Sequence, residues 1–322
     1  MSANDLLIRM QQGDRLALAR LMTLVEARPP EIYRIMSQVA RMAKGAPRLG
    51  ITGPPGAGKS TVIDGLIRLL RSQHKTVGAV AIDPSSPFSG GAVLGDRVRM
   101  QDHSIDPGVF IRSLGSRGSH GGISRATMEV ALLLDAFGMD EILIETVGVG
   151  QTELDIMGIA NTTVVVLVPE AGDTVQTLKA GLMEIGDIFV VNKADRDGAD
   201  RMAAELRAMV EISPSPKEWA APVLLTSARE GKGLEELLEA VMSHRRHLAD
   251  RPETEAFRRN YLKRQFLEII LAELCLRLDS TPEIEIIARQ ILSGAEDPYA
   301  AAAELLSDPS RLAQFLRLRD KQ

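Results

Sequence analysis

The stretch GPPGAGKST, residues 53–61, combines glycines, a lysine and hydroxyl groups in an order that suits phosphate chemistry. Glycines let backbone N–H groups turn inward around an anion, and the lysine ammonium can reach the β and γ oxygens of a nucleoside triphosphate. A hydroxyl after the lysine can bind Mg²⁺. We therefore predict that the phosphates are bound by Gly53, Pro54, Pro55, Gly56, Ala57, Gly58, Lys59, Ser60 and Thr61, with Lys59 as a catalytic group.

A second motif, Asn-Lys-Ala-Asp, follows the apolar run IFVV and ends at Asp195. The Asp195 carboxylate can accept hydrogen bonds from the N1–H and the exocyclic amine of guanine, whereas adenine has no N1–H to offer. Taken alone, the motif could also be a polar turn. Downstream of a phosphate loop it favours guanine over adenine, and we predict that the base is bound by Asn192, Lys193, Asp195, Ser227 and Ala228.

Three acidic residues are candidates to hold Mg²⁺ together with Ser60. Glu145 ends the run DEILIE, Asp83 follows another apolar run, and Asp96 stands in a glycine-rich stretch. Sites of this class usually have an aspartate where Glu145 stands, so direct contact with the ion and contact through water both remain open. Asp83 could instead cap a turn, and Asp96 could pair with a neighbouring arginine.

Hydrolysis needs a group that orients water, and the sequence offers no strong one. Gly148 is expected to meet the γ-phosphate with its N–H, but the next residue, Val149, cannot orient water as a glutamine there would. Gln151 is the nearest candidate, and we expect slow hydrolysis until a partner or a second subunit completes the site. The arginines that could donate to the transition state, or else form surface ion pairs, are Arg97, Arg99, Arg112 and Arg117.

The elements that must position these residues are short apolar runs alternating with glycine-rich loops and helical stretches. Such alternation predicts an α/β P-loop NTPase fold with a doubly wound, mostly parallel sheet. The expected strands are residues 49–51, 76–82, 109–111, 141–144, 163–168, 188–191 and 223–225.

Helical periodicity flanks the predicted sheet on both sides. Before it, apolar residues recur at three- and four-residue spacing in two expected helices, separated by Pro29 and Pro30. After residue 235 a helical stripe runs from Leu237 to Leu278. We predict three parts: an N-terminal helical segment at 1–47, a GTP-binding domain at 48–245, and a C-terminal helical region at 246–322.

Composition narrows the class of protein. Its 322 residues carry a formal net charge of -5, so we expect no nucleic-acid partner. The one cysteine, Cys275, excludes an intrachain disulfide and fits a reducing compartment. No apolar run approaches the roughly 18 residues that span a bilayer, and no signal-peptide pattern is visible. We expect a cytoplasmic protein without membrane partners.

These motifs together resemble one known family. GITGPPGAGKST, AIDPSSPFSGGAVLGDRVRM, ILIETVGVGQTE, EAGDTVQTLKAGLMEIGDIFVVNKAD and SAREGKGLEEL are similar to the methylmalonyl-CoA mutase-associated GTPases, the MeaB/ArgK group of metallochaperone GTPases. The likeness covers roughly residues 48–245.

The resemblance implies a GTPase that attends an adenosylcobalamin-dependent acyl-CoA mutase, gating cofactor loading and reactivation. It implies GTP or GDP as ligand, a homodimer formed by the C-terminal helices, adenosylcobalamin held by the partner, and an adenosyltransferase as a further candidate partner. A segment corresponding to Gly172–Glu184 would couple nucleotide state to partner contact, with Lys179 as a candidate catalytic group and Asp173 beside it; Lys179 could also be a solvated helix charge. The loop SLGSRGSHGG departs from the usual family pattern, so the mutase that is served stays open.

Three other functions stay open: a kinase acting on a transport protein or small molecule, a metal-delivery GTPase, and a largely non-hydrolysing interaction module. No substrate pocket or acceptor-activating base for a kinase is visible in the sequence. His244 and His247 could share a helical face, and we expect them to be a solvated surface pair rather than metal ligands.

Overall fold

The structure is a computed structural model, and it describes residues 1–29, 31–83, 103, 105–115, 125–146, 156–169, 182–212, 219–249, parts of 259–278, 281–308 and 310. Two compact units form, Met1–Thr254 and Glu255–Gln322. The predicted division at residues 47/48 and 245/246 stays a prediction.

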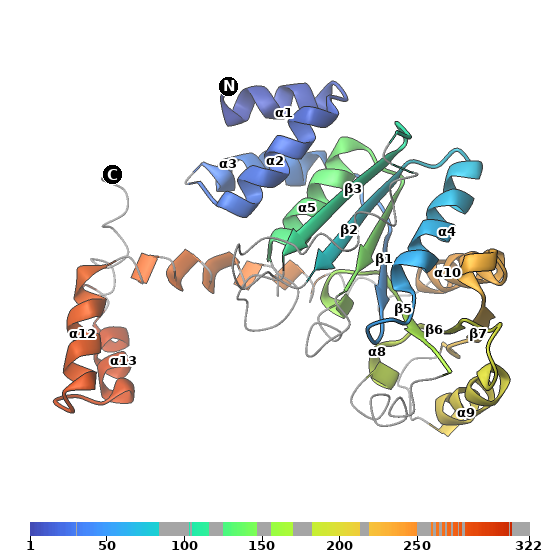
Figure 1. Cartoon of the computed structure of the whole chain (residues 1–322). Coiled ribbons are helices and arrows are strands. Elements are labelled where there is room, and N and C mark those ends of the chain that lie inside the picture. Colours follow the sequence, from blue (N-terminus) through green and yellow to red (C-terminus); the bar gives the residue numbers. More distant parts are fainter. Residues whose placement is uncertain are drawn as a thin grey trace. The chain divides into compact units, whose positions relative to one another are not determined.

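A sheet of seven parallel strands lies at the centre of the first unit (Figure 1). Its order is β3-β2-β4-β1-β5-β6-β7, with β1 in the middle. This confirms the predicted fold class and the seven predicted runs, although β3 continues four residues beyond its expected end. The strands are β1 (Arg48–Thr52), β2 (Val77–Asp83), β3 (Val109–Gly115), β4 (Glu141–Glu145), β5 (Thr162–Leu167), β6 (Ile188–Asn192) and β7 (Val223–Thr226).

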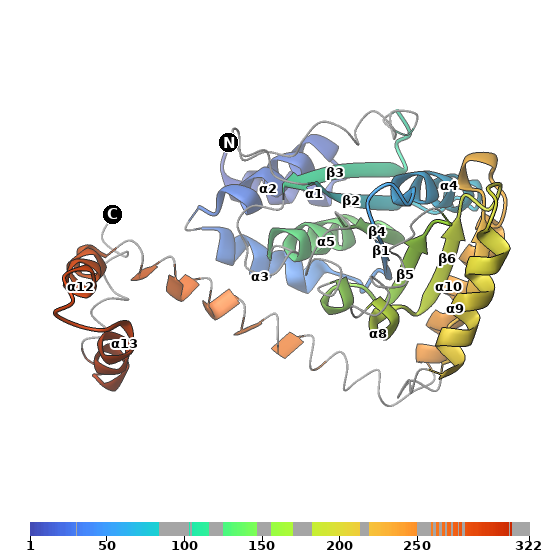
Figure 2. The ribbon, with the colours of Figure 1, turned by 60° about the horizontal axis from the view of Figure 1, so that its bottom comes forward.

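Helices cover both faces of the sheet, which is why its inner strands are apolar along their whole length. The helices α4 (Lys59–Ser72) and α10 (Leu234–Ala249) share one apolar cluster with one face. The helices α5 (Arg125–Phe137) and α9 (Ala199–Ile212) share the other cluster. Alternate residues of β4 enter the two clusters, Leu143 one and Ile142 and Ile144 the other, as the two-residue period of a strand requires. Figures 1 and 2 show these layers from two directions.

Three helices, rather than the two expected, precede the sheet. They are α1 (Ala3–Gln11), α2 (Arg15–Ala27) and α3 (Ile32–Met42), and they lie beside α5 (Figure 1). The break that we missed is at Gly13, which has φ +85°, a value that a helix cannot accommodate. Asp14 then caps α2 by accepting hydrogen bonds from the N–H groups of Leu16 and Ala17 at 2.9 and 3.1 Å.

Short helices lie in the connections of the first unit. They are α8 (Met183–Ile185) and the 3-10 turns η2 (Ile156–Gly158) and η4 (Ala228–Glu230). The turn η4 directly follows β7, so it holds Ala228 at the edge of the sheet where the strands end.

The second unit contains α12 (Pro282–Leu292) and α13 (Pro298–Ser307), and its described residues between 262 and 278 are helical. Large apolar side chains are exposed here, including Phe266 (61%), Leu292 (89%) and Tyr299 (88%). Within the described ranges, no helix has both the length and the apolar character needed to cross a bilayer.

Candidate functional site: a nucleotide pocket where the strands end

The phosphate loop connects β1 to α4, as the sequence predicted. Gly53 and Gly58 have φ values of +131° and +87°, which residues with side chains rarely adopt. A Cβ atom on Gly53 would also lie 2.0 Å from the carbonyl oxygen of Val166 on β5. The glycines are therefore required by both conformation and space, and they let the loop turn its backbone toward a ligand.

Two buried side chains begin α4. The Lys59 ammonium donates hydrogen bonds to the carbonyl oxygens of Gly53 and Pro54 at 2.8 and 3.1 Å. The Ser60 hydroxyl donates to Glu145 Oε1 at 2.7 Å, and both side chains are about 5% exposed. Lys59 is thus held across the mouth of its own loop, where a phosphate oxygen could replace the carbonyl groups.

Oxygen donors gather beside Ser60. Glu145 ends β4, and Asp83, which is 3% exposed, ends the neighbouring strand β2 two residues beyond the register partner of Glu145. A hydroxyl and carboxylates are the donor types that Mg²⁺ prefers, so these residues fit that ion. No group of three or more His, Cys, Asp or Glu side chains is arranged to hold a metal ion within the described ranges.

Asn192 ties the phosphate loop to the base motif. Its Nδ2 donates to the carbonyl oxygen of Ala57 at 2.9 Å. Its Oδ1 accepts from the Thr226 hydroxyl and from the Ala228 N–H, each at 3.1 Å. The side chain is 3% exposed, and a Cβ atom on Gly58 would lie 2.4 Å from its Nδ2. Three segments that are far apart in sequence therefore meet at one buried amide.

The predicted base-recognition residue, Asp195, is exposed at the edge of the pocket. Its Oδ1 accepts a hydrogen bond from the Ser227 hydroxyl at 3.0 Å, and this bond is the main cause that lowers the pKa of Asp195 below its ordinary value. The Ala194 N–H donates to the Thr226 carbonyl oxygen at 2.9 Å, and Lys193 has φ +60°. The carboxylate is thus kept ionised, as an acceptor for the guanine edge must be.

Several predicted site residues lie outside the described residues: Gly148, Gln151, Lys179, Asp96 and, among the other candidates, Arg97, Arg99, Arg117 and Asp173. The predicted phosphate, base and remaining metal residues are all described, and all of them stay predictions. Arg112 pairs with Glu26 of α2, its Nε lying 3.1 Å from Glu26 Oε1, which favours the structural alternative for this arginine.

The sequence reasoning missed two polar contacts around the site. The Thr146 hydroxyl donates to the Thr52 hydroxyl at 2.9 Å, joining the ends of β4 and β1. Asp64, one turn beyond Ser60 on α4, lies 2.8 Å from His103 Nε2. Polar residues at the carboxyl ends of parallel strands were the available signal for the threonine pair, whereas nothing in the sequence joins Asp64 to His103.

The expectation of a solvated histidine pair was wrong for His244. It is 3% exposed, with Nδ1 3.0 Å from the Thr162 hydroxyl and Nε2 3.6 Å from Asp187. These partners stand at the starts of β5 and β6, at the edge of the sheet opposite to the nucleotide pocket. The buried imidazole therefore holds α10 against the sheet.

Comparison with known proteins shows which family this chain resembles. The family model described as methylmalonyl-CoA mutase-associated GTPase MeaB matches residues 18–283. A protein of Pyrococcus horikoshii that is described as a GTPase is 46% identical over 303 residues, covering 93% of this chain and 96% of that protein. The mouse methylmalonic aciduria type A homolog, a mitochondrial protein, is 34% identical over 317 residues, with 92% and 76% covered.

A solved structure described as an LAO/AO transport system kinase has a TM-score of 0.69 and 26% identity, and the match covers 98% of this chain and 97% of that one. The chain therefore shares its fold with that protein. Because the family model spans most of the sequence and the phosphate loop has the geometry described above, the chain belongs to the MeaB family of P-loop GTPases.

Proposed function

We propose that this GTPase acts as a chaperone and regulator of an adenosylcobalamin-dependent acyl-CoA mutase, gating cofactor loading and reactivation through GTP hydrolysis. The observation that carries the proposal is the match to the mutase-associated family model over residues 18–283. The described nucleotide residues are compatible with it, because the phosphate loop, Asn192 and Asp195 form one connected pocket.

In this proposal each described side chain has one task. Lys59 leaves the carbonyl oxygens of Gly53 and Pro54 to stabilise the charge on the β- and γ-phosphates. Asp195 accepts from the guanine edge. To donate to guanine O6, the Ala228 N–H would leave Asn192 Oδ1 and the Ser227 N–H would leave the Lys232 carbonyl oxygen. Ser60, Glu145 and Asp83 hold Mg²⁺, which when bound supplies positive charge to the phosphate oxygens.

The described residues of the site supply groups for binding the nucleotide, whereas most of the groups proposed for its hydrolysis are not among them. Their side chains supply a cation for the phosphates, donors for the metal and an acceptor for the base. The proposed water-orienting residue Gln151, the γ-phosphate contact Gly148, and the candidates Lys179 and Asp96 lie outside the described residues. We expect slow hydrolysis by the isolated protein and faster hydrolysis when the mutase, or a second copy of the chain, completes the site.

The exposed apolar residues of the second unit support a homodimer. Monomeric proteins rarely expose many large apolar side chains together, because each forfeits the free energy of burial. The exposed residues on the described helical segments are Leu262, Phe266, Leu267, Ile270, Leu271, Ile286, Leu292, Tyr299 and Leu306. We propose that this unit is the dimerisation region, that the protein acts in the cytoplasm, and that an adenosyltransferase is a further partner.

A direct test mixes the purified full-length chain with adenosylcobalamin-dependent acyl-CoA mutases, one at a time, and measures phosphate release under saturating GTP. The cognate mutase should bind and raise the rate at least tenfold. The Asn161→Ala variant is a suitable control, because Asn161 accepts one hydrogen bond from the Arg48 N–H at the opposite edge of the sheet. If methylmalonyl-, isobutyryl-, ethylmalonyl- and hydroxyisobutyryl-CoA mutases neither bind nor change the rate, the proposed role is wrong.

A kinase is the second candidate, because a protein with this fold and 26% identity is described as a transport system kinase. Radiolabel from the γ-phosphate of GTP separates the two. A GTPase releases the label into solution, whereas a kinase leaves it on a transport protein or a small-molecule acceptor. A metal-delivery function would instead give nickel binding in equilibrium dialysis, in which His244 could take part only after leaving its buried position.

A further inference from the structure

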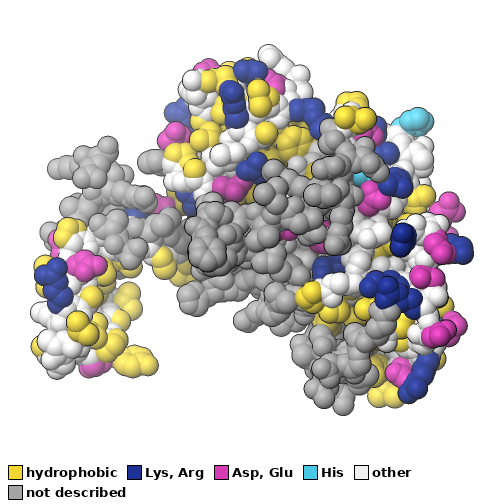
Figure 3. All heavy atoms as spheres, in the orientation of Figure 1, with side chains coloured by type: hydrophobic (Ala, Val, Ile, Leu, Met, Phe, Trp, Pro, Cys, Tyr) yellow, Lys and Arg dark blue, Asp and Glu magenta, His cyan; other side chains and the backbone are white. Residues whose placement is uncertain are grey.

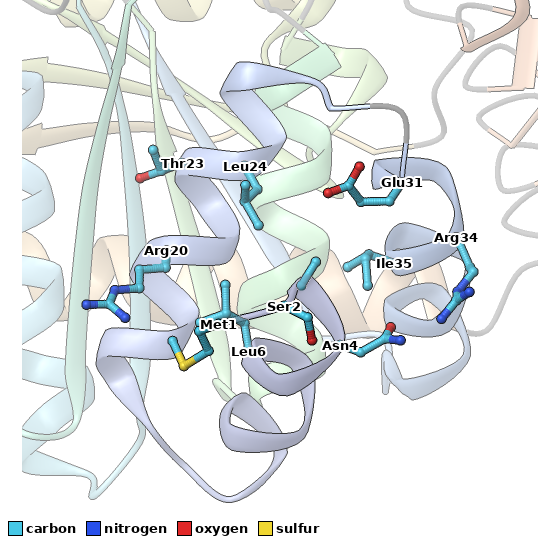
Figure 4. A pocket seen from close by; sticks show the side chains of 11 residues that line it. Met1, Ser2, Asn4, Leu6, Arg20, Thr23, Leu24, Glu31, Arg34 and Ile35 are labelled. Carbon is cyan, nitrogen blue, oxygen red and sulfur yellow. The ribbon is translucent and has the colours of Figure 1, made fainter. Parts of the chain in front are cut away.

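A hollow of about 600 Å³ lies among the three N-terminal helices, and its residues take no part in the nucleotide pocket. Its size is within the range of about 300–1,000 Å³ that ligand pockets occupy. Figure 4 shows the side chains that surround it. They come from the start of α1, from the middle of α2 and from the first turn of α3: Met1, Ser2, Ala3, Asn4, Leu6, Arg20, Thr23, Leu24, Glu31, Arg34 and Ile35.

The floor of the hollow is apolar and fixed by the core beneath it. Leu6 and Ile35 are 4% and 2% exposed and belong to the apolar cluster that also contains α5, while Leu24 packs against that cluster from the surface. The start of α1 is held by reciprocal hydrogen bonds between Ser2 and Asp5 at 2.9 and 3.2 Å. The buried core and the capped start of α1 therefore support the floor of the hollow.

Two arginines stand on opposite sides of this floor (Figure 4). In the part of the chain that the structure describes, neither the Arg20 nor the Arg34 guanidinium has a hydrogen-bond or ion-pair partner. The other arginines of α1, α2 and α3 and of their connections are all engaged: Arg9 with Asp14, Arg15 with the carbonyl oxygens of Pro107 and Val109, Arg28 with Glu129, and Arg41 with Ser37. Among the arginines of this described segment, the two without a partner are thus the two that border the hollow.

The charge pattern decides what kind of partner fits. Glu31 borders the hollow above Ile35, with its carboxylate directed toward Leu24 (Figure 4), so it would repel an acidic group placed over Leu24 and Ile35. An apolar side chain at the centre would cover Leu6, Leu24 and Ile35, while carboxylates on either side would reach the two guanidinium groups. Arginine and buried apolar contacts are also what protein interfaces concentrate at their strongest points.

We propose that the hollow is a docking site for an amphipathic segment of a partner protein, in which one apolar anchor is flanked by acidic residues. The site would hold the partner independently of nucleotide, because Arg20, Arg34 and the floor residues lie on α1, α2 and α3, whereas the described phosphate- and base-binding residues follow β1, β6 and β7. The proposal does not depend on which enzyme the GTPase serves or on its rate of hydrolysis.

The test uses a labelled, end-blocked helical peptide with one leucine and with glutamates four residues before and after it. Fluorescence anisotropy with the full-length chain should show saturable binding that weakens with salt. The double variant Arg20→Gln/Arg34→Gln removes both proposed ion pairs between the chain and the peptide glutamates. Because both pairs are exposed, the peptide should bind this variant about tenfold more weakly than the wild type. The control Arg201→Gln changes an exposed arginine on α9 and should bind as the wild type does.

A second peptide with glutamines in place of the glutamates completes a double-mutant cycle. The wild type should bind this glutamine peptide as weakly as the double variant binds the glutamate peptide. The double variant should bind both peptides with the same affinity. Absence of saturable binding, or equal binding of the first peptide by the wild type and the double variant, overturns the proposal. The proposal is also overturned if sedimentation shows that the two substitutions dissociate an oligomer of the chain. In that case a second copy of the chain, and not a partner protein, occupies the hollow. Thermal unfolding and GTP hydrolysis of the double variant should stay at wild-type values.

Discussion

The Asn192→Ala variant gives the most direct test of the pocket, because Asn192 joins the phosphate loop to the base motif. The substitution removes three hydrogen bonds of a side chain that is only 3% exposed. It leaves the Ala57 carbonyl oxygen, the Ala228 N–H and the Thr226 hydroxyl without that partner. Because a buried hydrogen bond contributes about 0.5–1.5 kcal/mol net, we expect the free energy of unfolding to fall by about 3 kcal/mol.

Nucleotide binding should weaken by less than this, because the three hydrogen bonds are missing from the free and the bound variant alike. If the loops relax in the free variant, GTP must bring them together again, and this reordering cost is subtracted from the binding free energy. Since about 1.4 kcal/mol equals a factor of ten, a reordering cost of that size weakens GTP binding about tenfold. Isothermal titration calorimetry with Mg²⁺ measures the affinity, and urea unfolding followed by circular dichroism measures the stability.

A matched control distinguishes the effect of Asn192→Ala from the general effect of replacing an asparagine with alanine. Asn161→Ala makes the same chemical change where one exposed hydrogen bond joins Asn161 to the Arg48 N–H. We expect it to cost about 1 kcal/mol or less and to leave GTP affinity unchanged. If Asn192→Ala keeps wild-type affinity while its stability falls, the amide supports the fold alone and our account of the pocket is refuted.

Four further substitutions, at three residues, test the recognition of base and metal. Asp195→Asn should weaken GTP about a hundredfold, since a charged acceptor is lost, and should improve binding of xanthosine triphosphate, whose carbonyl group can accept from the new amide; calorimetry measures both. Ser227→Ala removes the hydrogen bond that lowers the pKa of Asp195. Because the ionised carboxylate persists above its pKa and is lost as the pH falls through it, GTP affinity of Ser227→Ala should decline at a higher pH than that of the wild type, and coincident pH profiles would contradict this. Glu145→Asp should lose the 2.7 Å contact with Ser60 and weaken Mg²⁺-dependent GTP binding about fivefold. Glu145→Gln should weaken this binding further, because it removes the negative charge. If both variants bind GTP as tightly as the wild type does, Glu145 is not part of the metal site.

The strands could be predicted because each of the inner ones is an uninterrupted apolar run between polar loops. The end of β3 could not, because Arg112 and Ser113 interrupt the apolar pattern that began at Val109. In the structure Arg112 is accommodated by Glu26 of α2, a contact across 86 residues that no local pattern reveals. The break before α2 could have been predicted, because Gly13 and the cap residue Asp14 mark it in the sequence.

The candidate site was easier to predict than the contacts that stabilise it. Lys59, Ser60 and Asp195 occur in motifs whose spacing is set by the nucleotide itself. His244 occurs in no motif, and its partners Thr162 and Asp187 are 82 and 57 positions away in the chain. Burial of such a residue depends on which strands become neighbours, and only the folded sheet determines that.

The order of the strands explains why distant motifs form one pocket. In a parallel sheet all carboxyl ends meet at one edge, and ligands bind there in folds of this kind. Since β1 lies between β4 and β5, the phosphate loop after β1 has Glu145 on one side and, beyond β5, Asn192 on the other. Direct hydrogen bonds from Ser60 to Glu145 and from Asn192 to Ala57 join these segments. The strand order therefore brings the candidate phosphate, base and metal residues to one edge of the sheet, whereas the hydrolysis candidates Gly148 and Gln151 lie outside the described residues.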